Sequence, residues 1–174
     1  MKKMILAGFG GQGMLLCGQL LAYAAMAEGL NVTWFPSYGP EMRGGAAACT
    51  VVVSEKPVGS PVVQFADIVV TASQPAFEKY NKSVAEGGTM LYHSAFVKIT
   101  EKRDDVKYIG VDFAELTKDF PKAANVAMLG AINKLAGCAS IESLRAALVY
   151  KFGNKNEKVL VINENAIAIG AEAV

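Results

Sequence analysis

The stretch Lys3-Met4-Ile5-Leu6-Ala7-Gly8-Phe9-Gly10-Gly11-Gln12-Gly13 decides how the chain folds. Its apolar first half, Lys3–Ala7, predicts a buried strand, and the glycines that follow predict a tight turn. The next residues, Gln12–Glu28, have the length and composition of a helix, and Gly29 is a typical C-cap. A strand that turns on glycines into a helix is the opening unit of many α/β folds.

Strands and helices alternate along the rest of the chain. The segment between Phe35 and Ala46 is too short for a crossover helix, so the strands on either side of it are expected to pair antiparallel. We therefore predict one domain over residues 1–174, with a Rossmann-like three-layer α/β fold and a mostly parallel, mixed sheet. The strands expected after the first are Asn31–Phe35, Ala46–Ser54, Asp67–Thr71, Thr89–Tyr92 and Val106–Val111, and the later helices are expected over 73–84, 112–118, 123–136 and 140–150 and from Asn163.

A second stretch, Ser37-Tyr38-Gly39-Pro40-Glu41-Met42-Arg43-Gly44-Gly45, is called here the signature loop. Turn residues fix its backbone shape, and it presents a phenol and two opposite charges. Such loops on a rigid scaffold carry many binding and catalytic residues, although a plain connector is the simpler explanation. Arg43 offers a planar fork for a carboxylate, a phosphate or an acidic residue of a partner. Glu41 alternatively pairs with Arg43 and stiffens the loop.

The two stretches together resemble the gamma subunit of 2-oxoacid:ferredoxin oxidoreductases, whose signatures are G-x-G-G-Q-G and then S-Y-G-P-E-x-R-G-G. Further matching segments are Ser60-Pro61, Glu86-Gly87-Gly88-Thr89 and Ala124–Ala131. The resemblance implies a subunit of a cytoplasmic complex of the pyruvate, 2-oxoglutarate or ketoisovalerate type. Such a complex converts a 2-oxoacid and CoA into an acyl-CoA, CO2 and reduced ferredoxin. The resemblance further implies that this chain completes the active-site wall and holds the other subunits in register.

The same resemblance implies the cofactors and partners of the complex. They are thiamine diphosphate, Mg²⁺, CoA and iron–sulfur clusters, with alpha and beta subunits that bind thiamine diphosphate and a ferredoxin-like subunit. This chain has no G-D-G motif for Mg²⁺ and diphosphate. Its three cysteines, Cys17, Cys49 and Cys138, are widely spaced, whereas a cluster takes four close thiolates. We therefore expect the chain to bind none of these cofactors alone and not to be catalytic alone.

The residues expected at the active-site wall or at a partner contact come from the glycine turn, the signature loop and one asparagine. Asn125 matches an asparagine of the family pattern and is expected to cap a helix or to hydrogen-bond to the glycine turn. His93 is the only histidine, so no metal site is expected, and we place it on the surface or in a loop. The charge run Lys102–Asp105 is expected to be solvated. The site residues are Gly10, Gly11, Gln12, Ser37, Tyr38, Glu41, Arg43, Gly44 and Asn125.

Two other functions remain open. Gly8, Gly10 and Gly13 fit the dinucleotide-binding pattern G-x-G-x-x-G, so a stand-alone nucleotide-binding regulatory module is one alternative. This pattern requires an acidic residue about 20 residues later to bind the ribose hydroxyls, but Pro36 and Ser37 occupy that place. In the alternative interpretation, the glycines only allow the helix to pack closely against the sheet. The second alternative is the matching subunit of indolepyruvate:ferredoxin oxidoreductase.

Composition narrows the classes of partner. Hydrophobic residues make up 52% of the chain and charged residues 19%, with a net charge of +1. The basic residues do not cluster, which argues against nucleic acid, and no apolar run reads as a signal peptide or membrane span, which favours the cytoplasm. The shortage of charge predicts covered surface, and a homodimer when the chain is isolated. The helix Gln12–Glu28 is apolar all round, so either the C-terminal helices or a partner must cover it.

Overall fold

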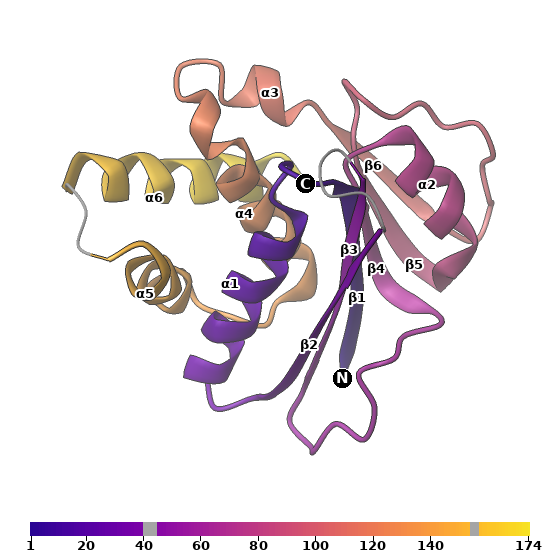
Figure 1. Ribbon diagram of the computed structural model, residues 1–174, viewed down its shortest axis with the longest axis horizontal. Coiled ribbons are helices and arrows are strands. Elements are labelled where there is room, and N and C mark those ends of the chain that lie inside the picture. Colours follow the sequence, from indigo (N-terminus) through magenta and orange to yellow (C-terminus); the bar gives the residue numbers. More distant parts are fainter. Residues whose placement is uncertain (40–44, 154–156) are drawn as a thin grey trace.

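The computed structural model describes residues 1–39, 45–153 and 157–174 (Figure 1). Within them, β3 pairs antiparallel with both β1 and β2, whereas β1 with β4, β4 with β5 and β5 with β6 pair in parallel. The predicted mixed, mostly parallel sheet is confirmed, including the antiparallel pair β2–β3. The strand order is β2-β3-β1-β4-β5-β6, with β1 Lys2–Phe9, β2 Asn31–Tyr38, β3 Ala46–Ser54, β4 Ala66–Thr71, β5 Val84–His93 and β6 Lys107–Val111.

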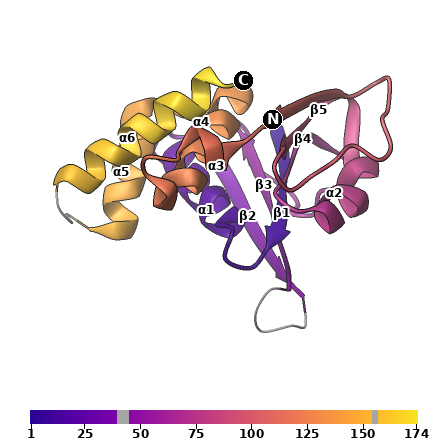
Figure 2. The same ribbon diagram turned by 90° about the horizontal axis from the view of Figure 1, so that it is seen from above.

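Helices cover both faces of this sheet, as Figure 2 shows from above, which gives the three layers of the predicted α/β fold. One face carries α1 Met14–Ala27, α3 Phe113–Leu116, α4 Ala124–Ala136, α5 Ile141–Phe152 and α6 Glu157–Glu172, and the other carries α2 Gln74–Tyr80. Short 3₁₀ helices at Asn81–Ser83 and Pro121–Ala123 precede β5 and α4. Within the described residues, no helix combines the length and the apolar character that crossing a membrane requires.

The C-terminal helices cover α1, which is the first of the two explanations for its apolar surface. The Tyr23 ring of α1 packs edge-on against Tyr150 of α5, with 5.1 Å between the ring centroids. At the end of α1, Glu28 Oε1 accepts hydrogen bonds from the N–H of Ser140 (2.8 Å) and the hydroxyl of Ser143 (2.7 Å), where α5 begins. These contacts hold α5 along α1, so the chain itself covers this part of the helix, whereas Leu15 and Leu16 near its start line an open groove.

Several element boundaries differ from the predicted ones, among them the end of β2, which lies at Tyr38 rather than Phe35 because Ser37 and Tyr38 still pair with β3. β5 begins at Val84 rather than Thr89, because Val84 pairs with Ala66 across a register shift in the sheet. α6 is already helical at Glu157, ahead of the predicted start at Asn163. The helix packs against α4 in its C-terminal half, where Ile167 and Gly170 are buried and a Cβ on Gly170 would overlap the backbone of Ala127.

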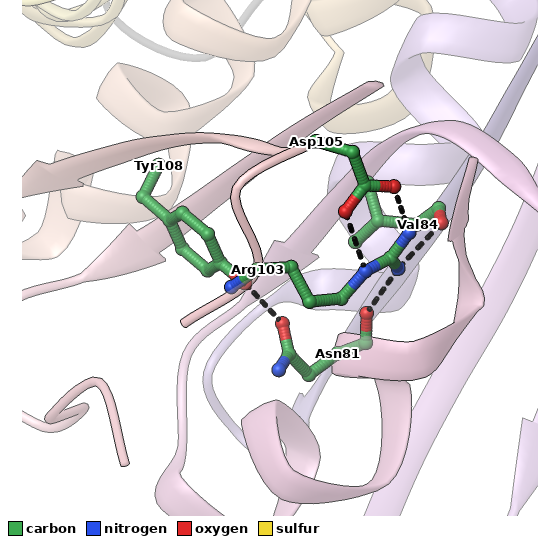
Figure 3. A network of polar contacts seen from close by, with 5 residues as sticks. All are labelled: Asn81, Val84, Arg103, Asp105 and Tyr108. Atoms are coloured by element: carbon green, nitrogen blue, oxygen red, sulfur yellow. Dashed lines mark hydrogen bonds and ion pairs between the residues drawn. The ribbon is translucent and has the colours of Figure 1, made fainter. Parts of the chain in front are cut away.

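The charge run Lys102–Asp105 is mostly exposed, as expected, but Arg103 is partly buried and its guanidinium joins three segments (Figure 3). Its Nη1 donates to the backbone carbonyls of Val84 (2.8 Å) and Asn81 (3.2 Å), while Nε and Nη2 donate to the Asp105 carboxylate. The Tyr108 hydroxyl accepts from the Arg103 N–H (3.1 Å) and donates to Asn81 Oδ1 (2.8 Å). The network fastens the segment before β6 to the start of β5.

Candidate functional site

The glycine turn joins β1 to α1 at the carboxyl end of the strand. Gly11 (φ 99°) and Gly13 (φ 82°) are left-handed, so α1 begins after the turn rather than at Gln12 as predicted. The Gln12 side chain closes the turn, because its Oε1 accepts from the Phe9 N–H (2.6 Å) and its Nε2 donates to the Ala72 carbonyl (2.8 Å). Gln12 thus ties the turn to the residue that follows β4, and both ends of its amide are occupied by the protein itself.

Asn125, in the first turn of α4, packs against the glycine turn. A Cβ at position 13 would lie 2.8 Å from Asn125 Nδ2, so the side chain of Asn125 uses the space that Gly13 leaves free. The Cys17 thiol of α1 donates to the backbone carbonyl of Asn125 (3.1 Å). No side-chain hydrogen bond caps α4, and among the described residues the buried Oδ1 of Asn125 has no hydrogen-bond partner. Asn125 therefore meets the turn through packing, and the cap is not formed.

The two ends of the signature loop lie beside the glycine turn. The Gly10 N–H donates to the Gly45 carbonyl (2.9 Å), which joins the turn directly to the end of the loop. The Gly39 N–H donates to the Ala46 carbonyl (2.7 Å), which continues the pairing of β2 with β3 up to the loop. Backbone hydrogen bonds thus bring together two motifs that are separated in the sequence.

The side chains at the end of β2 are open to solvent. Ser37 is exposed, and Tyr38 is 70% exposed. Three further predicted site residues, Glu41, Arg43 and Gly44, lie outside the described residues. Their roles therefore stay predictions, based on the described loop ends that flank them.

Four of the predicted site residues line one groove, namely Gly10, Gly11, Tyr38 and Asn125. Phe9, which is 40% exposed, and Tyr38 are its aromatic members, Met14, Leu15 and Leu16 of α1 add large apolar side chains, and much of the remaining lining is glycine and alanine. Among the described lining residues, Tyr38 is the one with a titratable side chain, so the groove presents no carboxylate, lysine or histidine. Because glycine and alanine have little or no side chain, another molecule can approach the backbone closely here.

The described residues of this groove do not fit the cofactors implied for the complex. Mg²⁺ in diphosphate sites is bound through carboxylates, and the described lining contains none. The three cysteines are buried, and burial raises the pKa of Cys17 and Cys49 to about 12 and that of Cys138 to about 11. These thiols stay protonated at neutral pH, whereas a cluster binds thiolates. In the described parts of the chain, no group of three His, Cys, Asp or Glu side chains is placed to hold a metal ion.

The structure corrects the expectation of a surface His93. The residue ends β5 and is 5% exposed, with its ring centroid 4.5 Å from that of Phe96 and 5.6 Å from that of Phe113. Burial lowers the pKa of its imidazole, and the charge of Asp112 opposes this shift. His93 and Gln12 line a second cavity next to the groove. The sequence signal for such a site was the position of His93 directly after a strand, where α/β proteins place functional groups.

Comparisons with known proteins show that this chain is similar to subunits of oxidoreductases. A model of the family "Pyruvate ferredoxin/flavodoxin oxidoreductase" matches residues 3–173. The ketoisovalerate oxidoreductase subunit VorA of Methanothermobacter marburgensis is 41% identical over 171 residues, which are 96% of this chain and 35% of VorA. The chain therefore spans about a third of the length of that relative.

Two further proteins match over most of their own length. The 2-oxoglutarate synthase subunit KorC of Methanocaldococcus jannaschii is 37% identical over 153 residues, which are 85% of this chain and 82% of KorC. The crystal structure of the keto/oxoacid ferredoxin oxidoreductase gamma subunit from Geobacter sulfurreducens superposes with a TM-score of 0.80 at 28% identity, covering 99% of this chain and 98% of the other. The similarity thus extends over sequence and fold together.

Proposed function

Because the chain belongs to the pyruvate ferredoxin/flavodoxin oxidoreductase family, we propose that it is the gamma subunit of a 2-oxoacid:ferredoxin oxidoreductase complex of the pyruvate, 2-oxoglutarate or ketoisovalerate type. The complex converts a 2-oxoacid and CoA into an acyl-CoA, CO2 and reduced ferredoxin. Thiamine diphosphate, Mg²⁺ and the iron–sulfur clusters are then held by the alpha, beta and ferredoxin-like subunits. The gamma subunit acts in the cytoplasm as a single domain.

Within this complex, the chain completes the wall of the active site and holds the other subunits in register. The groove at Gly10, Gly11, Tyr38 and Asn125 supports this role, because three segments distant in sequence meet there on a fixed backbone. A surface of backbone and exposed aromatic rings, without an acid or base among its described residues, suits contact with another subunit better than chemistry of its own. When the chain is isolated, the large hydrophobic side chains exposed on its surface also let it form a homodimer.

Arg43 and Glu41 are proposed to act beside this groove, since Gly39 and Gly45, which flank them in sequence, line it. Arg43 then binds the carboxylate of the 2-oxoacid, a phosphate of CoA or an acidic residue of a neighbouring subunit, and Glu41 contacts the same neighbour or pairs with Arg43. Loss of such a charge-assisted contact costs about 1.5–3 kcal/mol, which is roughly tenfold or more in KM or rate.

Steady-state kinetics of the complex reconstituted with Arg43→Ala separates these contacts. A higher KM for the oxoacid alone assigns Arg43 to its carboxylate, a higher KM for CoA alone to a phosphate, and weaker assembly to a partner subunit. Normal assembly with unchanged kinetics would refute a functional role and leave the loop as a connector.

The groove itself is tested by exchanging exposed tyrosines. Tyr38 is 70% exposed in the groove, and Tyr150 is 75% exposed on α5, outside the groove, where its ring contacts Tyr23, so each change to alanine removes a mostly exposed ring. Removal of an aromatic anchor from an interface costs on the order of 2 kcal/mol or more. Tyr38→Ala is therefore expected to weaken association with the partner subunits or to raise KM, while Tyr150→Ala does neither. If the two variants associate equally well with the partner subunits and have the same KM, the groove is not a contact surface.

A further inference from the structure

A second cavity of ≈ 370 Å³ lies beside the groove, and its lining includes Gly11, Gln12, Ala72, His93, Lys122 and Asn125. It lies where the carboxyl ends of β1, β4 and β5 meet the start of α4. β1 and β4 are adjacent and parallel, yet α1 leaves β1 on one face of the sheet and α2 leaves β4 on the other (Figure 2). Open α/β sheets bind ligands at such a point of divergence.

His93 gives this cavity a buried polar group without a partner. Its side chain makes no hydrogen bond with the described residues, and its Nδ1 is sealed inside the protein. A buried acceptor is left unpaired more readily than a buried N–H, so we assign the proton of the neutral ring to Nε2. Nε2 is not among the sealed atoms, and the ring lines the cavity. The imidazole thus offers a hydrogen-bond donor toward that space.

Two further features around the cavity are positive, although the lining residue Asn125 also carries a buried amide oxygen without a partner among the described residues. Lys122 is exposed, forms no ion pair with the described residues and belongs to the residues that line the cavity. Ala124 and Asn125 begin α4, a helix of 13 residues whose N-terminus has no side-chain cap. Asp112, whose charge acts on the His93 imidazole, uses its Oδ1 as the N-cap of α3, where it accepts from the N–H groups of Ala114 and Glu115. A ligand in the cavity therefore meets donors and positive charge.

We propose that this cavity binds a small anion through a carboxylate or phosphate group, held by His93 Nε2–H, Lys122 and the first turn of α4. Phe96, 54% exposed and packed on the His93 ring, belongs to the apolar part of the lining, together with Pro121 and Met128. The residues involved all belong to this chain, so the site does not depend on the role proposed above for the complex.

The sole histidine makes the test direct, because a protein with one imidazole gives one set of side-chain signals in NMR. Long-range ¹H–¹⁵N spectra of the full chain are expected to show the Nε2–H form of His93. Addition of inorganic phosphate or of acetate, at ionic strength held constant with chloride, is expected to shift the imidazole signals saturably, with a Kd on the order of 1 mM. Tighter binding of phosphate assigns a phosphate-bearing ligand, and tighter binding of acetate a carboxylate.

Two lysine variants make the test specific. Lys122→Gln should raise the Kd about fivefold or more, as expected for loss of a charge-assisted contact. Lys118→Gln should leave it unchanged, because Lys118 is paired with Glu115 and is absent from the lining. An Nδ1–H tautomer, shifts that chloride reproduces, no shift with either anion, or equal effects of the two variants would each overturn the site.

Discussion

The side chain of Asn125 takes the space that a side chain on Gly13 would need. The Cβ position of residue 13 lies 2.8 Å from Asn125 Cβ and Nδ2, and Gly13 has a φ of 82°. The start of α4 can therefore lie this close to the glycine turn only because residue 13 is glycine. The groove and the cavity beside it both include Asn125, so this one contact positions both.

Gly13→Ala is expected to destabilise the fold by about 2–4 kcal/mol, because a left-handed alanine is strained and its Cβ overlaps Asn125. Gly29→Ala is the matched control. Gly29 is also left-handed (φ 78°) but has open space around its Cβ position, so only the strain of about 1 kcal/mol applies. Urea unfolding of the two variants measures the difference. Equal losses of unfolding free energy in the two variants would show that Asn125 does not contact residue 13 as closely as described.

Arg103→Gln is expected to lower the free energy of unfolding by about 1–3 kcal/mol. The change leaves the carbonyls of Asn81 and Val84 without their donor and frees Asp105, and the partial exposure of the Arg103 side chain keeps the loss moderate. Lys102→Gln removes a neighbouring exposed charge and should change stability by no more than about 0.5 kcal/mol. Similar midpoints for the two variants in chemical denaturation would rule out the network as a structural tie.

Stability should fall as the pH drops from 4.5 toward 2, partly through Glu28. Hydrogen bonds from Ser140 and Ser143 lower the pKa of its carboxyl from 4.5 to about 2. A depressed carboxyl pKa means that the unfolded chain binds the proton first, so the stabilisation is complete above pH 4.5 and is lost on acidification toward pH 2. Glu28→Gln should flatten this part of the profile of unfolding free energy against pH.

The exposed Glu86 on β5 provides the control for that profile. Its carboxylate makes no hydrogen bond within the described residues, so Glu86→Gln should keep the slope of the parent protein between pH 4.5 and 2. An unchanged slope in Glu28→Gln would mean that the contact between α1 and α5 does not depend on the ionised carboxylate.

The sheet was predictable because its signals are local. Apolar runs and the short connection before Ala46 were enough to predict the antiparallel pair within a mostly parallel sheet. Features that depend on distant partners were not predictable. The start of β5 at Val84 depends on pairing with Ala66, and the role of Arg103 depends on carbonyls of Asn81 and Val84, far back along the chain.

The candidate site was likewise predictable where its signals are local and not where they depend on distant residues. Tyr38 and the glycines were identified from the motifs, and the structure brings Gly10, Gly11, Tyr38 and Asn125 into one groove. The burial of His93 was missed, because it results from Phe96 and Phe113 packing on a residue that looks like a loop position. Gln12 was expected at a contact surface, yet its amide closes the turn. The sequence could not show this, because the acceptor, the carbonyl of Ala72, is distant in sequence.

The central claim is that this chain takes part in 2-oxoacid oxidation only as one subunit of a complex. Reduction of a low-potential dye should be followed for the chain alone, for the partner subunits without it and for the mixture, each with 2-oxoacid, CoA, thiamine diphosphate and Mg²⁺. We expect no turnover by the chain alone, little by the partners alone and full activity in the mixture. Turnover by the purified single chain, or full activity of the partners without it, would contradict the claim.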